Sequence, residues 1–205
     1  PLFLMLAALV GGMNLAIDST AGERERGSLE PLLLNPVSRR TIALGKWLAT
    51  ALSSTVVALF TLLTFVITIQ QLPLERLGMR VVLGAAEIVQ ILVAILPLTL
   101  FGAALQMLIA TFARSFKEAQ TYLSLLNLLP MAPAMFLMLG PPSDAWWMLP
   151  VPTMAQVATV VRVMRGDSVA AWQLLVIGVS SLAYSAVCLA CLERLLRRER
   201  IIFGR

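Results

Sequence analysis

Five long stretches of apolar residues constrain this chain more than any other feature of its sequence. A transmembrane helix needs about 20 consecutive apolar residues. Stretches that approach or exceed this length lie at residues 1–17, 47–70, 84–112, 119–139 and 171–192. Charged residues make up only 13% of the chain, whereas an ordinary soluble domain carries about 25%. The sequence therefore predicts an all-α, polytopic transmembrane helix bundle with five visible spans, covered largely by lipid.

The basic residues predict how this bundle is oriented in the membrane. Twelve of the sixteen Lys and Arg residues lie in segments 18–46, 113–118 and 193–205, and four lie in the alternate segments 71–83 and 140–170. Basic residues concentrate in cytoplasmic loops, so we expect a multi-pass protein of the cell membrane whose basic tail, 193–205, is cytoplasmic. The net charge of +5 then reflects these loops and not a nucleic-acid partner.

Segment 140–170, on the expected outer face, carries signals for a short helix. Trp146 and Trp147 suit the membrane interface, where an indole ring is partly hydrated. Thr153 and Gln156 match a helix capping box, and Gly166 is a typical helix terminator. We predict an extracellular or re-entrant segment whose short helix lies on, or dips into, the outer face. The alternative is a simple lid that ties two spans together.

Segment 18–46, on the expected cytoplasmic side, has the most informative local chemistry. Residues 23–26 alternate in charge, and we expect them to be solvated. Ser28 is a good N-cap and Asn35-Pro36 is a stop signal, which together predict a short cytoplasmic helix over 29–34; Ser38 then caps the next helix. This short helix could dock into a groove of a partner protein or lie flat on the lipid as an anchor. The leucines on its exposed face are Leu29, Leu32 and Leu33.

Three motifs of this segment resemble the cytoplasmic signature of type-2 ABC exporter permeases, and most closely that of the NatB-like sodium-efflux branch. They are Gly22-Glu-Arg-Glu-Arg-Gly-Ser-Leu-Glu-Pro-Leu-Leu-Leu, Pro36-Val-Ser-Arg and Gly45-Lys46. Ser28 stands where such permeases often have threonine, and either residue can cap a helix. The resemblance implies that residues 1–205 are a single transmembrane permease domain. It also implies a fragment that lacks the family's first span and large extracellular region and does not transport alone.

The resemblance further implies the partners of the chain. In such exporters a separate ATPase subunit binds the cytoplasmic segment, and the permease pairs with a second copy or a homologue. ATP is then used by the partner, and we expect no cofactor and no enzymatic activity in this pore-forming chain. The only Gly-Lys pair is followed by Trp47, which does not fit a phosphate-binding loop. By resemblance, ATPase docking falls on Arg24, Glu25, Arg26, Gly27, Ser28, Leu29, Glu30, Leu32 and Leu33.

Two other classes of function fit parts of the sequence. A non-transporting membrane scaffold or assembly protein could recruit a cytoplasmic partner through the same short helix. An intramembrane hydrolase fits poorly, because the chain has no histidine and lacks the H-E-x-x-H and G-x-S-x-G motifs of common hydrolases. The two cysteines, Cys188 and Cys191, are too few for a zinc site.

Four polar residues in the predicted spans are candidates for a transport path, because polar groups are costly in lipid. They are Glu87, Gln90, Gln106 and Asn127. Each also has a simpler interpretation. Glu87 falls near the outer interface, where an ionised carboxylate costs little, and Gln106 and Asn127 could form hydrogen bonds between helices.

The distribution of basic residues generates a test of orientation. A reporter fused after Arg205 should be cytoplasmic, and a reporter inserted near Ser143 should be external, because the basic segments stay on the inner side. Paired alkaline phosphatase and fluorescent-protein fusions would measure the sidedness of both positions. Finding the two positions on the same side would contradict the predicted topology.

Overall fold

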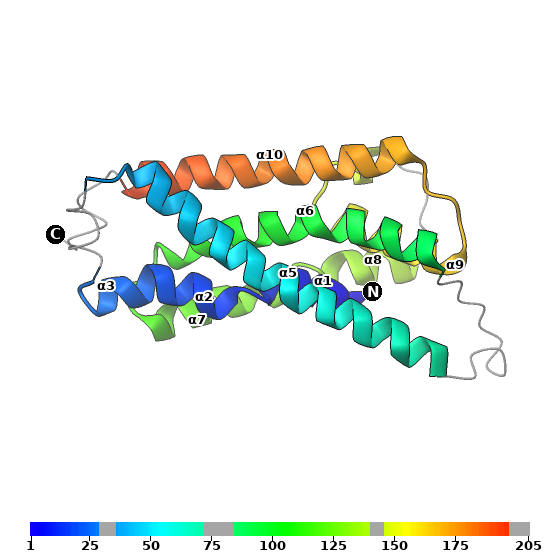
Figure 1. The fold of residues 1–205 in the computed structure, drawn as a ribbon, viewed down its shortest axis with the longest axis horizontal. Helices are drawn as coiled ribbons and strands as arrows, with labels where there is room; N and C mark the ends of the chain where they lie inside the picture. Colours follow the sequence, from blue (N-terminus) through cyan, green and yellow to red (C-terminus); the bar gives the residue numbers. More distant parts are fainter. Residues whose placement is uncertain (29–35, 72–83, 140–145, 197–205) are drawn as a thin grey trace.

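A computed structural model describes residues 1–28, 36–71, 84–139 and 146–196, and these residues are all helix, turn or irregular chain, without a strand. The helices form a bundle along one long axis (Figure 1). The longest are α5 (Arg39–Gln71), α6 (Ala85–Ala110) and α10 (Ala171–Leu196). Shorter elements are α1 (Leu2–Val10), α2 (Met13–Ile17), a π-helix over Asp18–Gly22, α3 (Glu23–Glu25), α7 (Phe116–Ser124), a 3-10 helix over Leu125–Leu128, α8 (Met131–Leu139), a 3-10 turn over Trp146–Met148 and α9 (Met154–Arg165).

Four helical stretches are long and apolar enough to cross a membrane: Leu2–Glu25, Arg39–Gln71, Ala85–Ala110 and Ala171–Leu195. They match the first, second, third and fifth predicted spans. Ser38 begins α5 as expected, because its hydroxyl accepts a hydrogen bond from the Thr41 amide at 3.1 Å. The polytopic all-helical prediction is therefore confirmed for these four stretches.

The first span is longer than predicted. The apolar pattern suggested an end near residue 17, but the helical path continues to Glu25 through α1, α2, the π-helix and α3. Ile17 and Ala21 remain fully buried in a cluster with Ala110 and Leu123, so one face of the helix still has apolar partners beyond residue 17. The expectation that residues 23–26 are all solvated is consequently wrong, since Glu23 and Arg24 are partly buried.

The fourth predicted span, 119–139, is not a continuous helix. The structure divides this region into α7, the 3-10 helix and α8, and none of the three is long enough to cross a membrane by itself. Pro130 explains the break, because proline lacks an amide hydrogen and its ring clashes with the carbonyl group one helical turn earlier. In Figure 1, α7 lies beside α2 at one end of the bundle and α8 lies near α9 towards the other, and contacts between these pairs agree.

The short helix predicted in segment 140–170 is present as α9. Its first turn is held by the Gln156 side chain, which accepts a hydrogen bond from the Thr153 amide at 2.7 Å. It ends at Gly166 in the left-handed conformation, with φ 81°. α9 does not merely cap the bundle, because Val157, Val160 and other residues of one face are buried against α1 and α6. Trp146 stays exposed, as an interfacial aromatic residue would.

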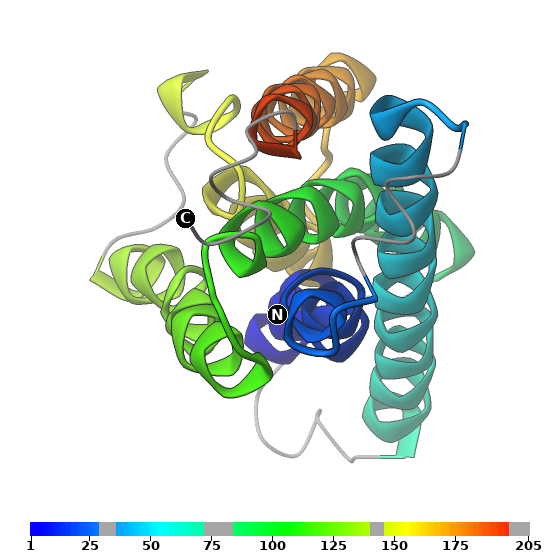
Figure 2. The same ribbon diagram turned by 90° about the vertical axis from the view of Figure 1, so that its left-hand side faces the viewer.

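α6 is the central helix of the bundle. Figure 2, which looks along the bundle, shows α6 between α10, α5, the first span and α7, and α6 contacts all of them. Half of its most apolar window is buried, compared with 17% in α5 and in α10. The exposed apolar faces of α5 and α10 are therefore the surfaces available to lipid.

The basic side chains gather at one end of this bundle. α3, the start of α5, the turn after α6 and the end of α10 all lie at the left in Figure 1, and we call this the basic end. Eight of the ten Lys and Arg residues whose positions the structure describes lie there, and Arg162 and Arg165 lie at the opposite end. The alternation of segments predicted from the sequence matches this arrangement.

Gly11 and Gly12 interrupt the first span at its closest approach to α5. A Cβ atom on Gly12 would lie 2.6 Å from both the Ser54 hydroxyl oxygen and the Thr50 carbonyl oxygen. A Cβ on Gly102 of α6 would lie 3.1 Å from the Cα of Leu9 on the other side. Small residues thus allow the first span to sit between α5 and α6, as they do at many membrane helix interfaces.

This packing predicts that Gly12→Ala destabilises the bundle while Gly45→Ala does not. The first substitution forces two backbones apart and should cost about 1–3 kcal/mol, as other overpacking substitutions do. Gly45 lies in α5 with nothing within 4 Å of a Cβ, and alanine favours helix. The midpoint of thermal unfolding in detergent would measure both effects. Equal midpoints for the two variants would mean that the close approach at Gly12 is not required.

Candidate functional site

An ion pair joins the end of the first span to α5 within the candidate docking segment, residues 22–46. The Lys46 ammonium group of α5 binds the Glu23 carboxylate and also donates to the Ser19 carbonyl at 2.6 Å. The side chains of Lys46 and Glu23 are only 16% and 22% exposed. A partly buried pair is screened less by salt than a surface pair, so this contact ties the end of the first span firmly to α5.

Arg24 links the same segment to the end of α6. Its guanidinium group donates to the Ala113 carbonyl at 2.9 Å and to the Thr111 carbonyl at 3.0 Å. These carbonyls lie at the C-terminal end of a helix, where backbone acceptors lack intrahelical partners and the helix dipole favours a cation. A planar guanidinium reaches two acceptors at once, which a lysine ammonium group does less well.

Glu25 links the segment to the start of α7. Its carboxylate accepts a hydrogen bond from the Phe116 amide at 2.7 Å, and an anion at a helix N-terminus is favoured by the dipole. Ser115 caps the same helix by accepting from the Glu118 amide at 3.2 Å. Hydrogen bonds from the Tyr122 hydroxyl and the Arg114 amide lower the pKa of Glu118. The turn between α6 and α7 therefore carries a cation at one helix end and anions at the other.

The next three residues close the first span, and their contacts within the described part of the chain are local. Arg26 forms an exposed ion pair with Asp18 at 2.8 Å, and this hydrogen bond raises the pKa of Arg26. Gly27 has a φ of 70°, which a glycine adopts without strain. The Ser28 amide and hydroxyl both donate to the Glu23 carbonyl, at 3.0 and 3.2 Å. Ser28 thus ends the helix before it, whereas the sequence suggested that it begins the helix after it.

The predicted docking helix itself lies outside the described residues. Leu29, Glu30, Leu32 and Leu33 belong to this part of the chain, and the helix over 29–34 stays a prediction. The structure describes the two anchors on either side of it, which are the junction at Glu23–Glu25 and the start of α5 at Arg39.

The four candidate path residues are not gathered at one place. Glu87 lies in the first turn of α6, where its carboxylate accepts from the Gly84 amide at 2.9 Å, and Gln90 is half-buried one turn further on. Gln106 lies 16 residues after Gln90 on the same helix, about 24 Å along its axis. Asn127 is exposed in the 3-10 helix that interrupts α7 and α8.

Gln106 is the most buried of these residues and contacts the first span. It is fully buried, and its side-chain amide donates to the Leu9 carbonyl just before the interruption at Gly11 and Gly12. Its side-chain oxygen has no hydrogen-bond partner. The contact is the hydrogen bond between helices that the sequence suggested as the simpler interpretation, and it satisfies a carbonyl near a helix break.

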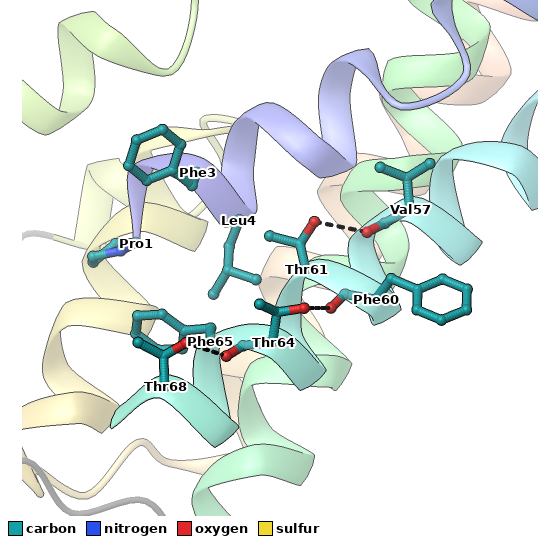
Figure 3. A pocket seen from close by; sticks show the side chains of 9 residues that line it. All are labelled: Pro1, Phe3, Leu4, Val57, Phe60, Thr61, Thr64, Phe65 and Thr68. Carbon is teal, nitrogen blue, oxygen red and sulfur yellow. Dashed lines mark hydrogen bonds between the residues drawn. The ribbon is translucent and has the colours of Figure 1, made fainter. Parts of the chain in front are cut away.

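One open groove lies between the first span and α5, near the N-terminus (Figure 3). Its volume is about 490 Å³, and mostly apolar side chains line it, including Phe3, Phe60 and Phe65. Three threonines of α5 also face it, and their hydroxyls donate to carbonyls of their own helix at 2.8 to 2.9 Å. The groove suits an apolar occupant such as a lipid chain. Over the ranges that the structure describes, no three His, Cys, Asp or Glu side chains come together as a metal site.

Sequence reasoning found the charged segment but missed its partners within the chain. The sequence identifies Lys46 as basic, but its ion pair with Glu23 joins residues 23 positions apart, and no local pattern predicts it. The carbonyls of Thr111 and Ala113 are backbone groups with no sequence signal. Gly27 was the one available signal for the end of the first span, because glycine favours this position after a helix.

Comparison with known proteins identifies the family to which this arrangement belongs. The family model described as ABC-2 family transporter protein matches residues 2–142. The ABC transporter permease protein NatB of Bacillus subtilis (strain 168) is 36% identical over 151 residues, which cover 70% of this chain and 38% of NatB. The matched stretch therefore spans well under half the length of this relative. Since the family match covers most of the chain and includes the charged junction and both of its flanks, the protein is a member of the ABC-2 transporter family and resembles the NatB permease.

Proposed function

We propose that this chain forms most of the membrane-spanning part of the permease subunit of an ATP-driven exporter. The observation that carries the proposal is the ABC-2 match over residues 2–142, which covers the segment between the first span and α5. In this proposal the fourth predicted span, residues 119–139, crosses the membrane although its helix is broken. The C-terminus is cytoplasmic, and a second permease copy or homologue completes the pore.

The proposed partner is a separate ATPase subunit that binds residues 22–46 from the cytoplasm. The support is the position of the described flanks, residues 22–28 and 36–46, at the basic end, together with the apolar leucine face expected over 29–34. ATP would then be bound and hydrolysed by that subunit. The alternative is a non-transporting scaffold that recruits a cytoplasmic partner through the same segment. ATP hydrolysis that responds to a transported solute in the reconstituted complex would separate the two.

The docking proposal predicts that Leu29→Ala combined with Leu33→Ala weakens ATPase binding. Removing central apolar anchors costs on the order of 2 kcal/mol or more, equivalent to about thirtyfold in affinity. Co-purification of the ATPase with the full-length permease, normalised to permease abundance, would measure the loss. Leu52→Ala with Leu63→Ala is the matched control, because both leucines are exposed on α5. Full retention of the ATPase, together with binding of the segment peptide to anionic vesicles, would favour a lipid anchor instead.

The proposed cargo is sodium, which follows from the resemblance to the NatB-like branch. Sodium efflux from vesicles that contain the full-length complex is the direct test. We expect Glu87→Gln to leave efflux within about twofold, because a glutamine oxygen can still accept the Gly84 hydrogen bond and a capping residue contributes only about 1 kcal/mol. A loss of tenfold or more, with the ATPase still bound, would instead place Glu87 on the transport path. Efflux of other solutes but not sodium would overturn the proposed cargo.

A further inference from the structure

The junction formed by Arg24 and Glu25 joins the docking segment to two helices at their adjoining ends. Arg24 holds the last carbonyls after α6, and Glu25 holds the first amide of α7. Hydrogen bonds to charged groups are stronger than those between neutral groups. Arg24 and Glu25 are adjacent residues of the first span, and both therefore contact other helices at the α6–α7 turn.

The same charged motif, residues 23–26, contains a second arginine, Arg26, whose contact lies elsewhere. Arg26 pairs with Asp18 within its own helical stretch, and a bond of this kind cannot transmit movement to another helix. Arg24 and Arg26 are equivalent in the sequence pattern, and a purely electrostatic docking site would use both. Only the tertiary structure separates them.

The helix after the turn is short, and an interruption separates it from the helix that follows. α7 has nine residues and ends at Ser124, and the helix is interrupted until Met131. An interruption of this kind absorbs a change of angle, as hinges at helix ends do. A force on the α6–α7 turn can thus reorient α7 without bending a continuous span.

We propose that Arg24 and Glu25 are positioning residues that couple the docking segment to the α6–α7 turn, so that movement of the segment by the ATPase swings α7 about the interruption at 125–130. The proposal rests on the proposed function, since it requires an ATPase partner. It assigns Arg24 and Glu25 this positioning task in place of the ATPase docking that the resemblance implies for them. The leucine face binds the ATPase, and Arg24 and Glu25 transmit the movement of the docking segment to the α6–α7 turn.

The test uses the full-length permease with its ATPase in nanodiscs, with Cys188 and Cys191 replaced by serine. A single reporter cysteine, Gln120→Cys, is placed on the exposed face of α7 and labelled with an environment-sensitive fluorophore. In the parent complex, ATP with vanadate should shift the emission of the reporter. In Arg24→Ala and in Glu25→Ala, which removes the acceptor of the Phe116 amide, this shift should be lost, while the ATPase stays bound and hydrolyses ATP within about twofold of the parent and solute efflux falls by about tenfold.

Two variants serve as controls. Arg26→Ala should keep the full emission shift, because its contact is local, and Arg24→Lys should keep part of it, because an ammonium group can bind one of the two carbonyls. A shift that survives in both Arg24→Ala and Glu25→Ala would overturn the proposal. Release of the ATPase from Arg24→Ala would also overturn it, since Arg24 would then be a docking residue. If Arg24→Ala does not accumulate, Glu25→Ala and Arg24→Lys decide by the same readout. A parent permease that binds no ATPase would refute the proposed function instead.

Discussion

A backbone polar group that cannot reach water must find a partner inside the protein, and this requirement governs much of the bundle. Where the helices are regular, the groups pair within each helix. Where they end or break, side chains take over. Gln106 binds the carbonyl of Leu9 near the glycine interruption, and Arg24 binds two carbonyls after α6. The places where helices end or break are therefore also the places where side chains make the most specific contacts between helices.

These contacts explain why the first span and α6 form the centre of the molecule. The first span departs from a regular α-helix twice, at Gly11 and Gly12 and at the π-helix, and α5 or α6 packs against it at both places. Close approach at Gly12 and Gly102 gives van der Waals contact that lipid would otherwise provide. α5 and α10 surround this centre and keep most of their apolar surface exposed, which is the distribution expected for helices that face lipid.

The functional features divide between the two ends of the bundle. The charged junction at the basic end is fastened to α5, α6 and α7 before the chain enters the segment proposed to bind an ATPase. Glu87 and Gln90 lie at the start of α6, near the opposite end, and Gln106 lies between them and the basic end. The four candidate path residues therefore do not form one transport path: three of them lie on α6 and one lies on the broken span. Among them only Gln106 is buried in contact with another helix.

The sequence by itself determined the membrane class, the four long spans, the alternation of basic and non-basic ends, the short helix α9 with its cap at Thr153 and Gln156, and the family. These depend on composition, periodicity and short local motifs, which are properties of neighbouring residues. Tertiary structure alone decided that the first span extends to Glu25 and that Arg24 and Arg26 have different roles. The reason is physical: the partners of Glu23, Arg24 and Glu25 are a lysine 23 residues away and backbone groups about 90 residues away. No local pattern encodes which helix ends will meet once the bundle is packed.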